Sequence, residues 1–429
     1  MFVAVTDSQE QLDIAIVGAG AAGLMASIWT GRTALEAGHT LRVAAFDGAA
    51  KLGAKILVAG GGRCNVTHHA VSEADFAGSS RHAVRKVLLR YPVDETVRFF
   101  NELGVGLKRE PTGKLFPITD KARTVLDALL NEALRVGVGF VNPCRVEAIE
   151  AHPEFFLLRT MRGDRRARRV ILATGGKALP RTGSDGAGFE FAKSLGHTLT
   201  SHTFPALAPL LLPSEHPLLA LSGVAQPATL SVTEPSGKRL TSFTNDLLIT
   251  HFGLSGPVVL DISRFWSARV LEGLPTEMRI NWIPQFVPAA VEHMLLEPGP
   301  TGVARILANH IPERLARALC EASLIDPARP LHSLRRDERK ALLLTVTDMR
   351  VPIVGDRGFT FAEATAGGVP LSEVVLETMA SRPCPGLHLC GEILDVDGRV
   401  GGFNFQWAWA SGFVAGVAAA NGVLATRNG

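Results

Sequence analysis

Three glycines near the N-terminus form the clearest chemical signal in the sequence. The run GAGAAG at 18–23 follows a short apolar segment at 13–17 and opens a helix-like stretch at 21–37. In this pattern the first glycine permits a tight turn, the second lets backbone approach a pyrophosphate, and the third allows close helix–strand packing. The start of the helix presents unpaired N–H groups to phosphate charge. The pattern therefore predicts a dinucleotide site.

An acidic residue supports this prediction. A second strand-like segment at 41–46 ends in Asp47, which is placed to accept a hydrogen bond from a ribose hydroxyl. An aspartate disfavours a 2′-phosphate because like charges repel, so the site is expected to take FAD or NAD rather than NADP. An ordinary strand-to-helix turn is the alternative, but it does not explain three glycines and an acid together.

A second constellation lies at 55–65 (KILVAGGGRCN). Three consecutive glycines can turn successive N–H groups toward an anion or let backbone press against a flat ring. Arg63 can reach a phosphate, and Asn65 offers both a donor and an acceptor. A flexible loop without a ligand is the alternative for this segment alone.

Two further groups follow strand-like segments. Thr174 and two glycines come after the apolar run at 170–173, where glycine keeps open the crevice in which α/β sheets bind ligands. GEILD at 391–395 follows the segment at 387–389, and GGFNFQ at 401–406 precedes an apolar helix. The acids could bind ribityl hydroxyls, and the glycine pair could bring N–H groups to flavin carbonyls. A glycine helix cap with a buried acid is the alternative for each.

These segments must be positioned by an α/β fold assembled from both ends of the chain. Strand, glycine turn, helix and strand at 13–46 form one crossover unit. We predict a discontinuous Rossmann-like domain at 1–203 and 345–429, an inserted β-rich domain at 204–287 and a helical subdomain at 288–344. Within the insert, PSG at 235–237 predicts a hairpin turn.

Composition narrows the class of protein. The chain has 46% hydrophobic and 20% charged residues and a net charge of only +3, which gives no reason to expect nucleic acid or an acidic membrane as a partner. Five scattered cysteines form neither a disulfide framework nor a zinc ligand set, so we expect no metal and a cytoplasmic location. The apolar stretch at 407–425 is predicted to be a buried helix rather than a membrane span. The oligomeric state is not readable.

Taken together, these motifs resemble the YhiN/BaiN-like family of FAD-dependent oxidoreductases within the glutathione-reductase-like flavoproteins. The specific carriers are GGGRCN and the run GEILDVDG…GG.N.QWA, and the likeness extends from 13 to 416. The resemblance implies an inserted domain that is in part β-barrel-like. It also implies a backbone contact of Val146 with adenine. The residues expected at the cofactor are Gly18, Gly20, Ala21, Ala22, Gly23, Asp47, Lys55, Gly61, Gly62, Arg63, Cys64, Asn65, Val146, Thr174, Gly175, Gly391, Glu392, Asp395, Gly402, Asn404, Phe405 and Gln406.

The expected activity is oxidoreduction by bound FAD, reduced by NAD(P)H and reoxidised by a small organic acceptor. No second glycine motif follows a strand, so NAD(P)H is expected to approach only transiently. No catalytic acid or base is assigned; His202 and His251 are candidates that more often are structural, and Cys64 lacks a nearby partner cysteine. The alternatives are a non-catalytic FAD-binding redox sensor or assembly protein, and a tRNA-modifying flavoprotein.

Overall fold

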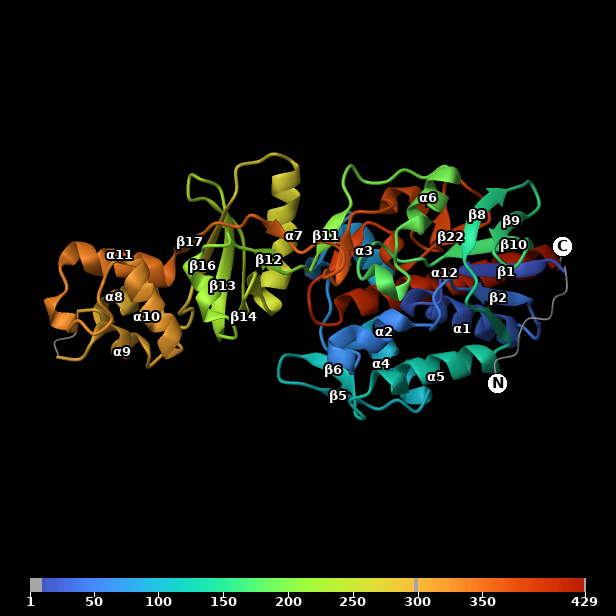
Figure 1. Ribbon diagram of the computed structural model, residues 1–429. Helices are drawn as coiled ribbons and strands as arrows, with labels where there is room; N and C mark the ends of the chain where they lie inside the picture. The colour runs from blue at the N-terminus through green and yellow to red at the C-terminus, as the bar shows by residue number, and fades with distance from the viewer. Residues whose placement is uncertain (1–9, 297–299, 428–429) are drawn as a thin grey trace. The chain divides into compact units, whose positions relative to one another are not determined.

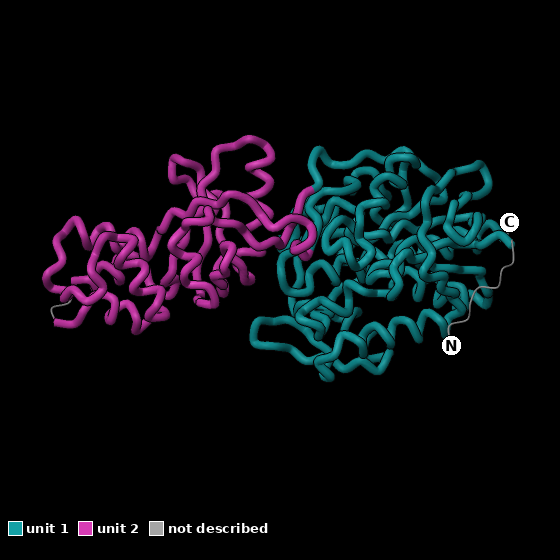
Figure 2. The backbone as a smooth tube through the Cα atoms, viewed as in Figure 1, with its two compact units in different colours: residues 1–203, 364–429 teal, residues 204–363 magenta. Residues whose placement is uncertain are grey.

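The computed structural model describes residues 10–296 and 300–427, which form two compact units (Figure 2). Unit 1 comprises Met1–Thr203 and Ala364–Gly429, and unit 2 comprises Phe204–Glu363. The predicted return to the nucleotide domain at 345 is wrong, because residues 345–363 belong to unit 2. They do so because strands β17 (Met349–Val351) and β18 (Gly355–Asp356) pair within the sheet of unit 2.

Unit 1 is built on a nine-stranded mixed sheet whose central strands β22, β10, β1 and β2 (Figure 1) continue to β7 and are all parallel. Strands β8, β9, β20 and β21 join it by antiparallel pairing. The pairing of β22 with β10 joins the two distant parts of the chain, with Val170 opposite Leu387. Every residue of β1 is buried, as expected for a parallel strand covered on both faces. The strands of this sheet are β1 (Leu12–Val17), β2 (Val43–Phe46), β7 (Val138–Val141), β8 (Val146–Ala151), β9 (Phe156–Thr160), β10 (Arg165–Leu172), β20 (Val374–Val375), β21 (Ala380–Ser381) and β22 (Leu387–Leu389).

Two helices pack tightly beside this sheet. A Cβ added at Gly412 or Gly416 of α12 would lie 2.5 Å from a carbonyl oxygen of α1, so only glycine permits this approach. Among the described residues, α12 is the one helix long and apolar enough to cross a membrane, and 67% of its most apolar window is buried in the protein. The helices of unit 1 are α1 (Ala21–Glu36), α2 (Ala54–Val58), α3 (Arg81–Leu88), α4 (Val93–Glu102), α5 (Ala122–Arg135), α6 (Ala187–Ser194) and α12 (Phe403–Arg427).

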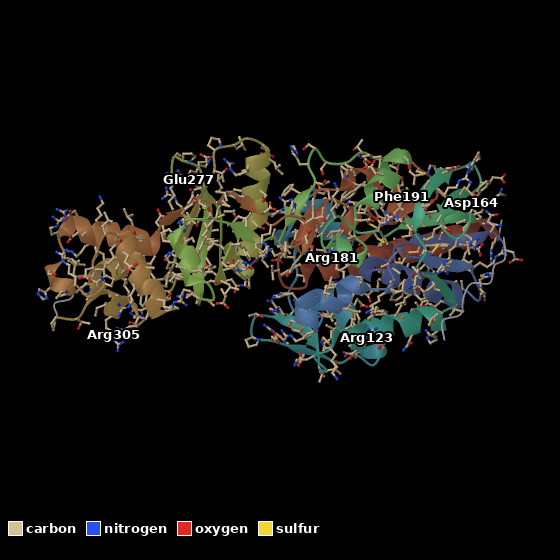
Figure 3. The ribbon with its side chains drawn as sticks, in the orientation of Figure 1. Arg123, Asp164, Arg181, Phe191, Glu277 and Arg305 are labelled. Atoms are coloured by element: carbon tan, nitrogen blue, oxygen red, sulfur yellow. The ribbon has the colours of Figure 1, made fainter. Side chains whose placement is uncertain are left out.

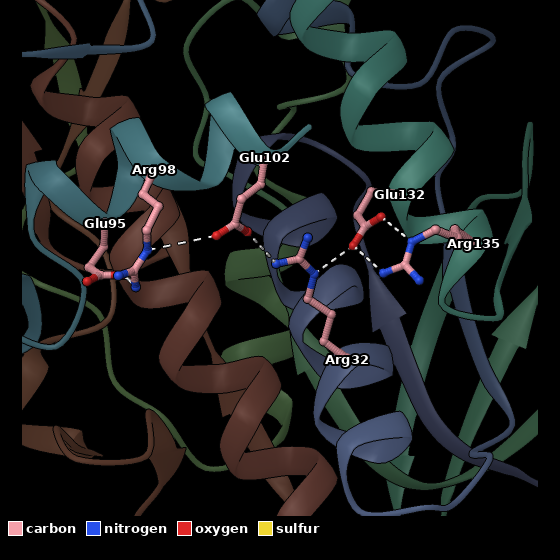
Figure 4. Close-up of polar contacts among 6 residues, drawn as sticks. All are labelled: Arg32, Glu95, Arg98, Glu102, Glu132 and Arg135. Carbon is pink, nitrogen blue, oxygen red and sulfur yellow. Dashed lines mark hydrogen bonds and ion pairs between the residues drawn. The ribbon is translucent and has the colours of Figure 1, made fainter. Parts of the chain in front are cut away.

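An ion-pair network fixes α1 to its neighbours (Figure 4). Arg32 of α1 donates to Glu132 of α5 at 2.6 Å and pairs with Glu102 of α4 at 3.3 Å, while Arg135 pairs with Glu132 at 2.6 Å. Burial alone would raise the pKa of Glu132, but the hydrogen bonds from Arg135 and Arg32 outweigh it and hold the pKa below its ordinary value.

Short strands complete unit 1 around the segments expected at the cofactor. A three-stranded sheet has the order β3-β6-β5, and β4 pairs with β23. The short strands of unit 1 are β3 (Thr67–His68), β4 (Phe76–Gly78), β5 (Leu107–Arg109), β6 (Lys114–Pro117), β19 (Ala364–Ala366), which is in neither of these sheets, and β23 (Val396–Gly398).

Unit 2 contains a seven-stranded antiparallel sheet, with the order β17-β16-β13-β14-β15-β12-β18. The predicted hairpin is present as the β13–β14 pair. Only residues 352–354 join the two edge strands, so the sheet must curl until its edges approach each other. The remaining strands are β11 (Phe204–Ala206), β12 (Leu210–Leu211), β13 (Ala225–Thr233), β14 (Arg239–Thr250), β15 (Gly253–Ser255) and β16 (Glu277–Asn281).

Helices enclose a separate hydrophobic core in unit 2. Buried Glu277 of β16, labelled in Figure 3, pairs with Arg279 at 3.0 Å and with Arg350 of β17 at 2.8 Å, which secures this edge of the sheet. The helices are α7 (Pro257–Leu271), α8 (Pro288–Met294), α9 (Val303–Leu307), α10 (Glu313–Ala322) and α11 (Arg336–Thr347).

Candidate functional site

The three glycines of the first turn have different surroundings. A Cβ at Gly18, where φ is +100°, would lie 2.4 Å from the carbonyl oxygen of Ala173, and one at Gly23 would lie 1.9 Å from that of Gly18. The fold itself therefore requires these two glycines. A Cβ at Gly20 would meet nothing within 4 Å. Packing does not explain Gly20, whereas close approach of a ligand pyrophosphate does.

Asp47 lies at the carboxyl end of β2 and faces the same turn. Its Oδ2 accepts a hydrogen bond from the Ala19 N–H at 2.7 Å, and its Oδ1 accepts one from the Ala49 N–H at 2.8 Å. Burial raises the pKa of this carboxyl group, while the two backbone hydrogen bonds oppose the rise. A carboxylate has about four acceptor positions, so capacity remains for ribose hydroxyls.

A further ion pair lies near Asp47. A Cβ at Gly183 would be 3.9 Å from Asp47 Oδ1, and Arg145 pairs with Asp185 at 2.6 Å. Burial alone would raise the pKa of Asp185, but the hydrogen bond from Arg145 helps to lower it. Sequence reasoning missed Arg145, although it immediately precedes Val146 at the start of β8. A Cβ at Gly48 would lie 3.5 Å from the Cβ of Arg145, so this ion pair lies beside the segment of Asp47, where the sequence predicts the adenosine ribose.

Two predicted cofactor residues carry buried oxygen atoms without partners. Asn65 Oδ1 and Thr174 Oγ1 accept or donate no hydrogen bond among the described residues. Buried polar atoms are seldom left unsatisfied, so each points to a group that the protein alone does not supply. Gly175 beside Thr174 has φ of +73°, and a Cβ there would lie 2.7 Å from Ser184 Oγ. This end of β10 therefore fits a polar ligand lying over it.

The loop after α2 presents bare backbone to its surroundings. Gly60, Gly61 and Gly62 have φ values of 58°, 68° and 84°, three successive left-handed residues. All three are exposed, and a Cβ at Gly61 would meet nothing within 4 Å. Such a run can direct consecutive N–H groups toward one ligand, as the sequence predicted.

The side chains that follow this loop turn toward the protein. Arg63 pairs with Glu110 at 2.6 Å, and its guanidinium carbon lies 4.0 Å from the centre of the Phe116 ring. The structure therefore does not place Arg63 as a phosphate ligand. Cys64 is fully buried, and burial raises the pKa of its thiol to about 12, so it is protonated at neutral pH.

Lys55 and Glu392, both predicted to border the cofactor, pair with each other at 2.5 Å. Glu392 also accepts a hydrogen bond from the Thr365 N–H at 2.7 Å. Asp395 is buried and accepts a hydrogen bond from the Ser79 hydroxyl at 3.2 Å. These acids therefore hold segments of unit 1 together. Ribityl hydroxyls that bind to them would share carboxylates that already accept hydrogen bonds from the protein.

The turn at 391–393 packs directly on the first glycine turn. A Cβ at Gly391 would lie 2.7 Å from the Cβ of Ala22. Its N–H donates to the Ser411 hydroxyl at 3.0 Å, and its carbonyl accepts from the Trp407 indole at 3.1 Å. The structure thus brings the first and fourth sequence constellations together, as the prediction required.

The start of α12 lies against β3. Gly402, with φ of +94°, is required because a Cβ there would be 2.6 Å from the carbonyl carbon of Thr67. Asn404 uses its amide to donate to the Gly398 carbonyl at 2.9 Å and to accept from the Gly398 N–H at 2.8 Å. The Asn404 side chain therefore stabilises the turn between Gly398 and the start of α12.

The next two side chains are also committed to the core. Phe405 stacks on Trp409 at 5.5 Å between ring centres. Gln406 is buried, accepts from the Thr67 and Thr96 hydroxyls at 2.7 and 3.0 Å, and donates to the Tyr91 carbonyl at 2.9 Å. If this helix contacts an isoalloxazine ring, its backbone N–H groups must make the contact, as expected at a helix N-terminus.

One histidine near the start of α12, His68, was not among the residues that the sequence predicted at the site. His68 stacks on Phe403 at 4.9 Å, and its Nδ1 lies 2.7 Å from the Ala70 carbonyl oxygen. The only sequence signal was its place three residues after the GGGRCN motif. His202 and His251 are both exposed, and their roles as acid or base stay predictions.

Comparison with known proteins identifies the relatives of this chain. The family model described as HI0933-like protein Rossmann domain matches residues 12–418. The chain belongs to the HI0933-like family. It is 35% identical to a 3-dehydro-bile acid delta(4,6)-reductase of Clostridium scindens, covering 95% of this chain and 98% of the relative. It is also 34% and 30% identical to ribosomal RNA dihydrouridine synthases of Escherichia coli and Haemophilus influenzae, covering 94% and 93% of this chain and 96% of each relative.

This HI0933-like protein is accordingly an FAD-dependent oxidoreductase with a Rossmann-type FAD-binding domain, which confirms the resemblance drawn from the motifs. The residues present fit FAD on structural grounds. Gly20 leaves open space, Asp47 faces the turn, and Asn65 and Thr174 have buried atoms without partners.

Proposed function

We propose that the protein reduces a carbon–carbon double bond conjugated to a carbonyl group, using FAD and NAD(P)H. The names of the relatives carry this proposal, because both reactions have this chemistry. In a 3-oxo steroid diene and in uracil, an alkene is conjugated to a carbonyl. A hydride adds to the electrophilic carbon of the reduced alkene, which is β to the carbonyl in uracil or an enone and δ to it at the remote alkene of a dienone, and a proton adds to the other alkene carbon.

The residues of the chain supply binding and orientation. Gly20 and the first N–H groups of α1 would hold the diphosphate, and Asp47 the ribose. Thr174 and Asn65 would satisfy their buried oxygen atoms against the bound cofactor. Bound FAD supplies hydride transfer. The protonated Cys64 thiol does not favour a disulfide-reductase mechanism.

Anaerobic half-reactions test the proposal. The oxidised holoprotein is mixed with NADH or NADPH, and loss of the visible flavin absorbance is followed. The reduced protein is then mixed with a conjugated 3-oxo steroid or with a uridine-containing ribosomal RNA transcript. We expect reoxidation by at least one acceptor and a product heavier by two hydrogens.

Saturated acceptors provide the matched controls: a 3-oxo steroid without the alkene, and RNA containing dihydrouridine. Neither should reoxidise the flavin. A flavin that stays oxidised with both nicotinamides would contradict the NAD(P)H assignment and favour the non-catalytic binding role. A chemically reduced flavin that no conjugated acceptor reoxidises would overturn the proposed reaction. The RNA acceptor also tests the expectation that nucleic acid is not a partner.

A further inference from the structure

An arginine in unit 2 lies between two aromatic rings. The guanidinium carbon of Arg357 is 4.1 Å from the centre of the Phe252 ring and 3.5 Å from that of Phe361. Both distances are within the range of a cation–π interaction. We call Phe252, Arg357 and Phe361 the arginine stack.

The backbone around this stack is held by the sheet. Phe252 lies in the turn between β14 and β15, and its carbonyl accepts a hydrogen bond from the Leu212 N–H at 3.2 Å. Arg357 directly follows β18, and its N–H donates to the Pro209 carbonyl at 3.1 Å. Because β12 pairs with both β15 and β18, one strand fixes both segments. The pairing of these strands therefore fixes the backbone at Phe252 and Arg357.

The stack keeps polar and apolar surface accessible. Phe361, which follows β18, is 45% exposed, and Val354, which precedes β18, is 62% exposed. His251 is exposed and meets Phe252 edge-on at 5.1 Å. The carboxylate of Asp356, directly before Arg357, accepts a hydrogen bond from the Gly358 N–H at 2.7 Å. Exposed apolar surface rimmed by polar residues is a feature of binding surfaces.

A second arginine–aromatic group, in unit 1, has different surroundings. Arg166 lies 4.8 Å from the centre of the Phe155 ring, which stacks on His152. There, Glu150 lies 3.8 Å from His152 and pairs with Arg159. Glu150 would repel an anionic ligand at this group. At the arginine stack the adjoining carboxylate, that of Asp356, already accepts hydrogen bonds from the Gly358 N–H at 2.7 Å and from the Ser267 hydroxyl at 3.4 Å.

We propose that the arginine stack binds a base and the adjoining phosphate of single-stranded RNA. A partly exposed aromatic ring such as that of Phe361 can accept a stacked base, and a neighbouring guanidinium can add phosphate contact; both are typical of single-strand recognition. A steroid could use the ring but offers no phosphate to Arg357. The inference rests on the proposed function, for which it selects the RNA substrate class.

This inference departs from the expectation drawn from the sequence. A net charge of +3 and the lack of an aromatic–basic cluster along the chain argued against RNA. The fold assembles such a cluster from the turn near 252 and the connection at 357–361, which no local sequence pattern joins.

Binding of a fluorescein-labelled single-stranded oligouridylate to oxidised holoprotein, followed by fluorescence anisotropy, tests the inference. We expect Phe361→Ala to weaken binding about tenfold, the effect of losing one base–aromatic stack. Arg357→Gln should weaken binding and lower the slope of log K against log salt by about one phosphate contact. Phe361→Trp should restore affinity, and Phe155→Ala in unit 1 should leave it unchanged.

No reductant is present, so the result is independent of whether the protein reduces uridine. Equal affinities of wild type, Phe361→Ala and Arg357→Gln would overturn the inference. So would intact RNA binding combined with a raised KM of Phe361→Ala for a conjugated 3-oxo steroid. RNA binding by the stack without uridine reduction would support the inference while contradicting the RNA arm of the proposed reaction.

Discussion

The two ends of the expected cofactor site are built differently. At the turn end, Gly20 leaves open space and Asp47 faces the same turn. At the helix end, the side chains of Asn404, Phe405 and Gln406 are all occupied by protein partners. Both ends can offer backbone N–H groups to a ligand, but only the turn end also offers a side chain, that of Asp47. A motif near a cofactor therefore includes residues that hold the backbone as well as residues that face the ligand.

The largest expected effect tests the packing requirement at the turn end. Gly23→Ala places a Cβ 1.9 Å from the Gly18 carbonyl oxygen, where backbone must move. We expect the free energy of unfolding to fall by about 3 kcal/mol or more, the upper range for overpacking. Urea unfolding of the apoprotein measures this loss. Unchanged stability would mean that the turn and α1 are not packed as described.

At the helix end, Gln406→Leu should remove stability without weakening FAD binding. The Thr67 and Thr96 hydroxyls and the Tyr91 carbonyl would each lose a buried partner. We expect a loss of about 2 to 3 kcal/mol, since an unsatisfied buried polar group costs about 1 to 3. Urea unfolding and an FAD titration separate the two effects. A variant of wild-type stability that binds FAD poorly would instead place this side chain at the ligand.

An intermediate loss of stability is expected for a substitution outside both ends of the cofactor site. Glu132→Gln weakens the network with Arg32 and Arg135 (Figure 4) and should lower the free energy of unfolding by about 1 to 2 kcal/mol. Because the folded-state pKa of Glu132 lies below its ordinary value, its contribution is present above the unfolded-state pKa of about 4.3.

The contribution of Glu132 is then lost as the pH falls through the folded-state pKa. The stability difference between wild type and Glu132→Gln should therefore be full at neutral pH and shrink in acid, while FAD affinity stays the same. Urea unfolding at several pH values measures it. A difference that grows on acidification would contradict the assigned direction of the pKa shift.

The smallest effect is expected for Cys64→Ala. The buried thiol is protonated at neutral pH, so the reductive and oxidative half-reactions should keep their wild-type rates. Removing the sulfur should cost about 1 kcal/mol of stability. Stopped-flow kinetics and urea unfolding check both. Loss of flavin turnover in a stably folded variant would show that the thiol takes part in the reaction.

The sequence predicted the backbone architecture better than the side-chain contacts. Periodic apolar runs and glycine spacing located β1, α1, β2 and the hairpin of unit 2, because local geometry determines those patterns. The end of unit 2 was misplaced because β17 and β18 are strands of three and two residues, too short to leave a periodic signal.

Side-chain partners were harder to predict because they depend on distant segments. The pairing of Arg63 with Glu110, and that of Lys55 with Glu392, cannot be read from residue type at one position. The same reason hid Arg145 beside Asp185 and the three residues of the arginine stack.

The most direct test of the cofactor site is an FAD titration of apoprotein carrying Gly20→Val. Gly20 has an extended backbone that valine can adopt, and its Cβ would meet no protein atom within 4 Å. We therefore expect stability within about 1 kcal/mol of wild type. We expect FAD affinity to fall at least about 100-fold, equivalent to about 3 kcal/mol. Wild-type FAD affinity in the folded Gly20→Val variant would contradict the account.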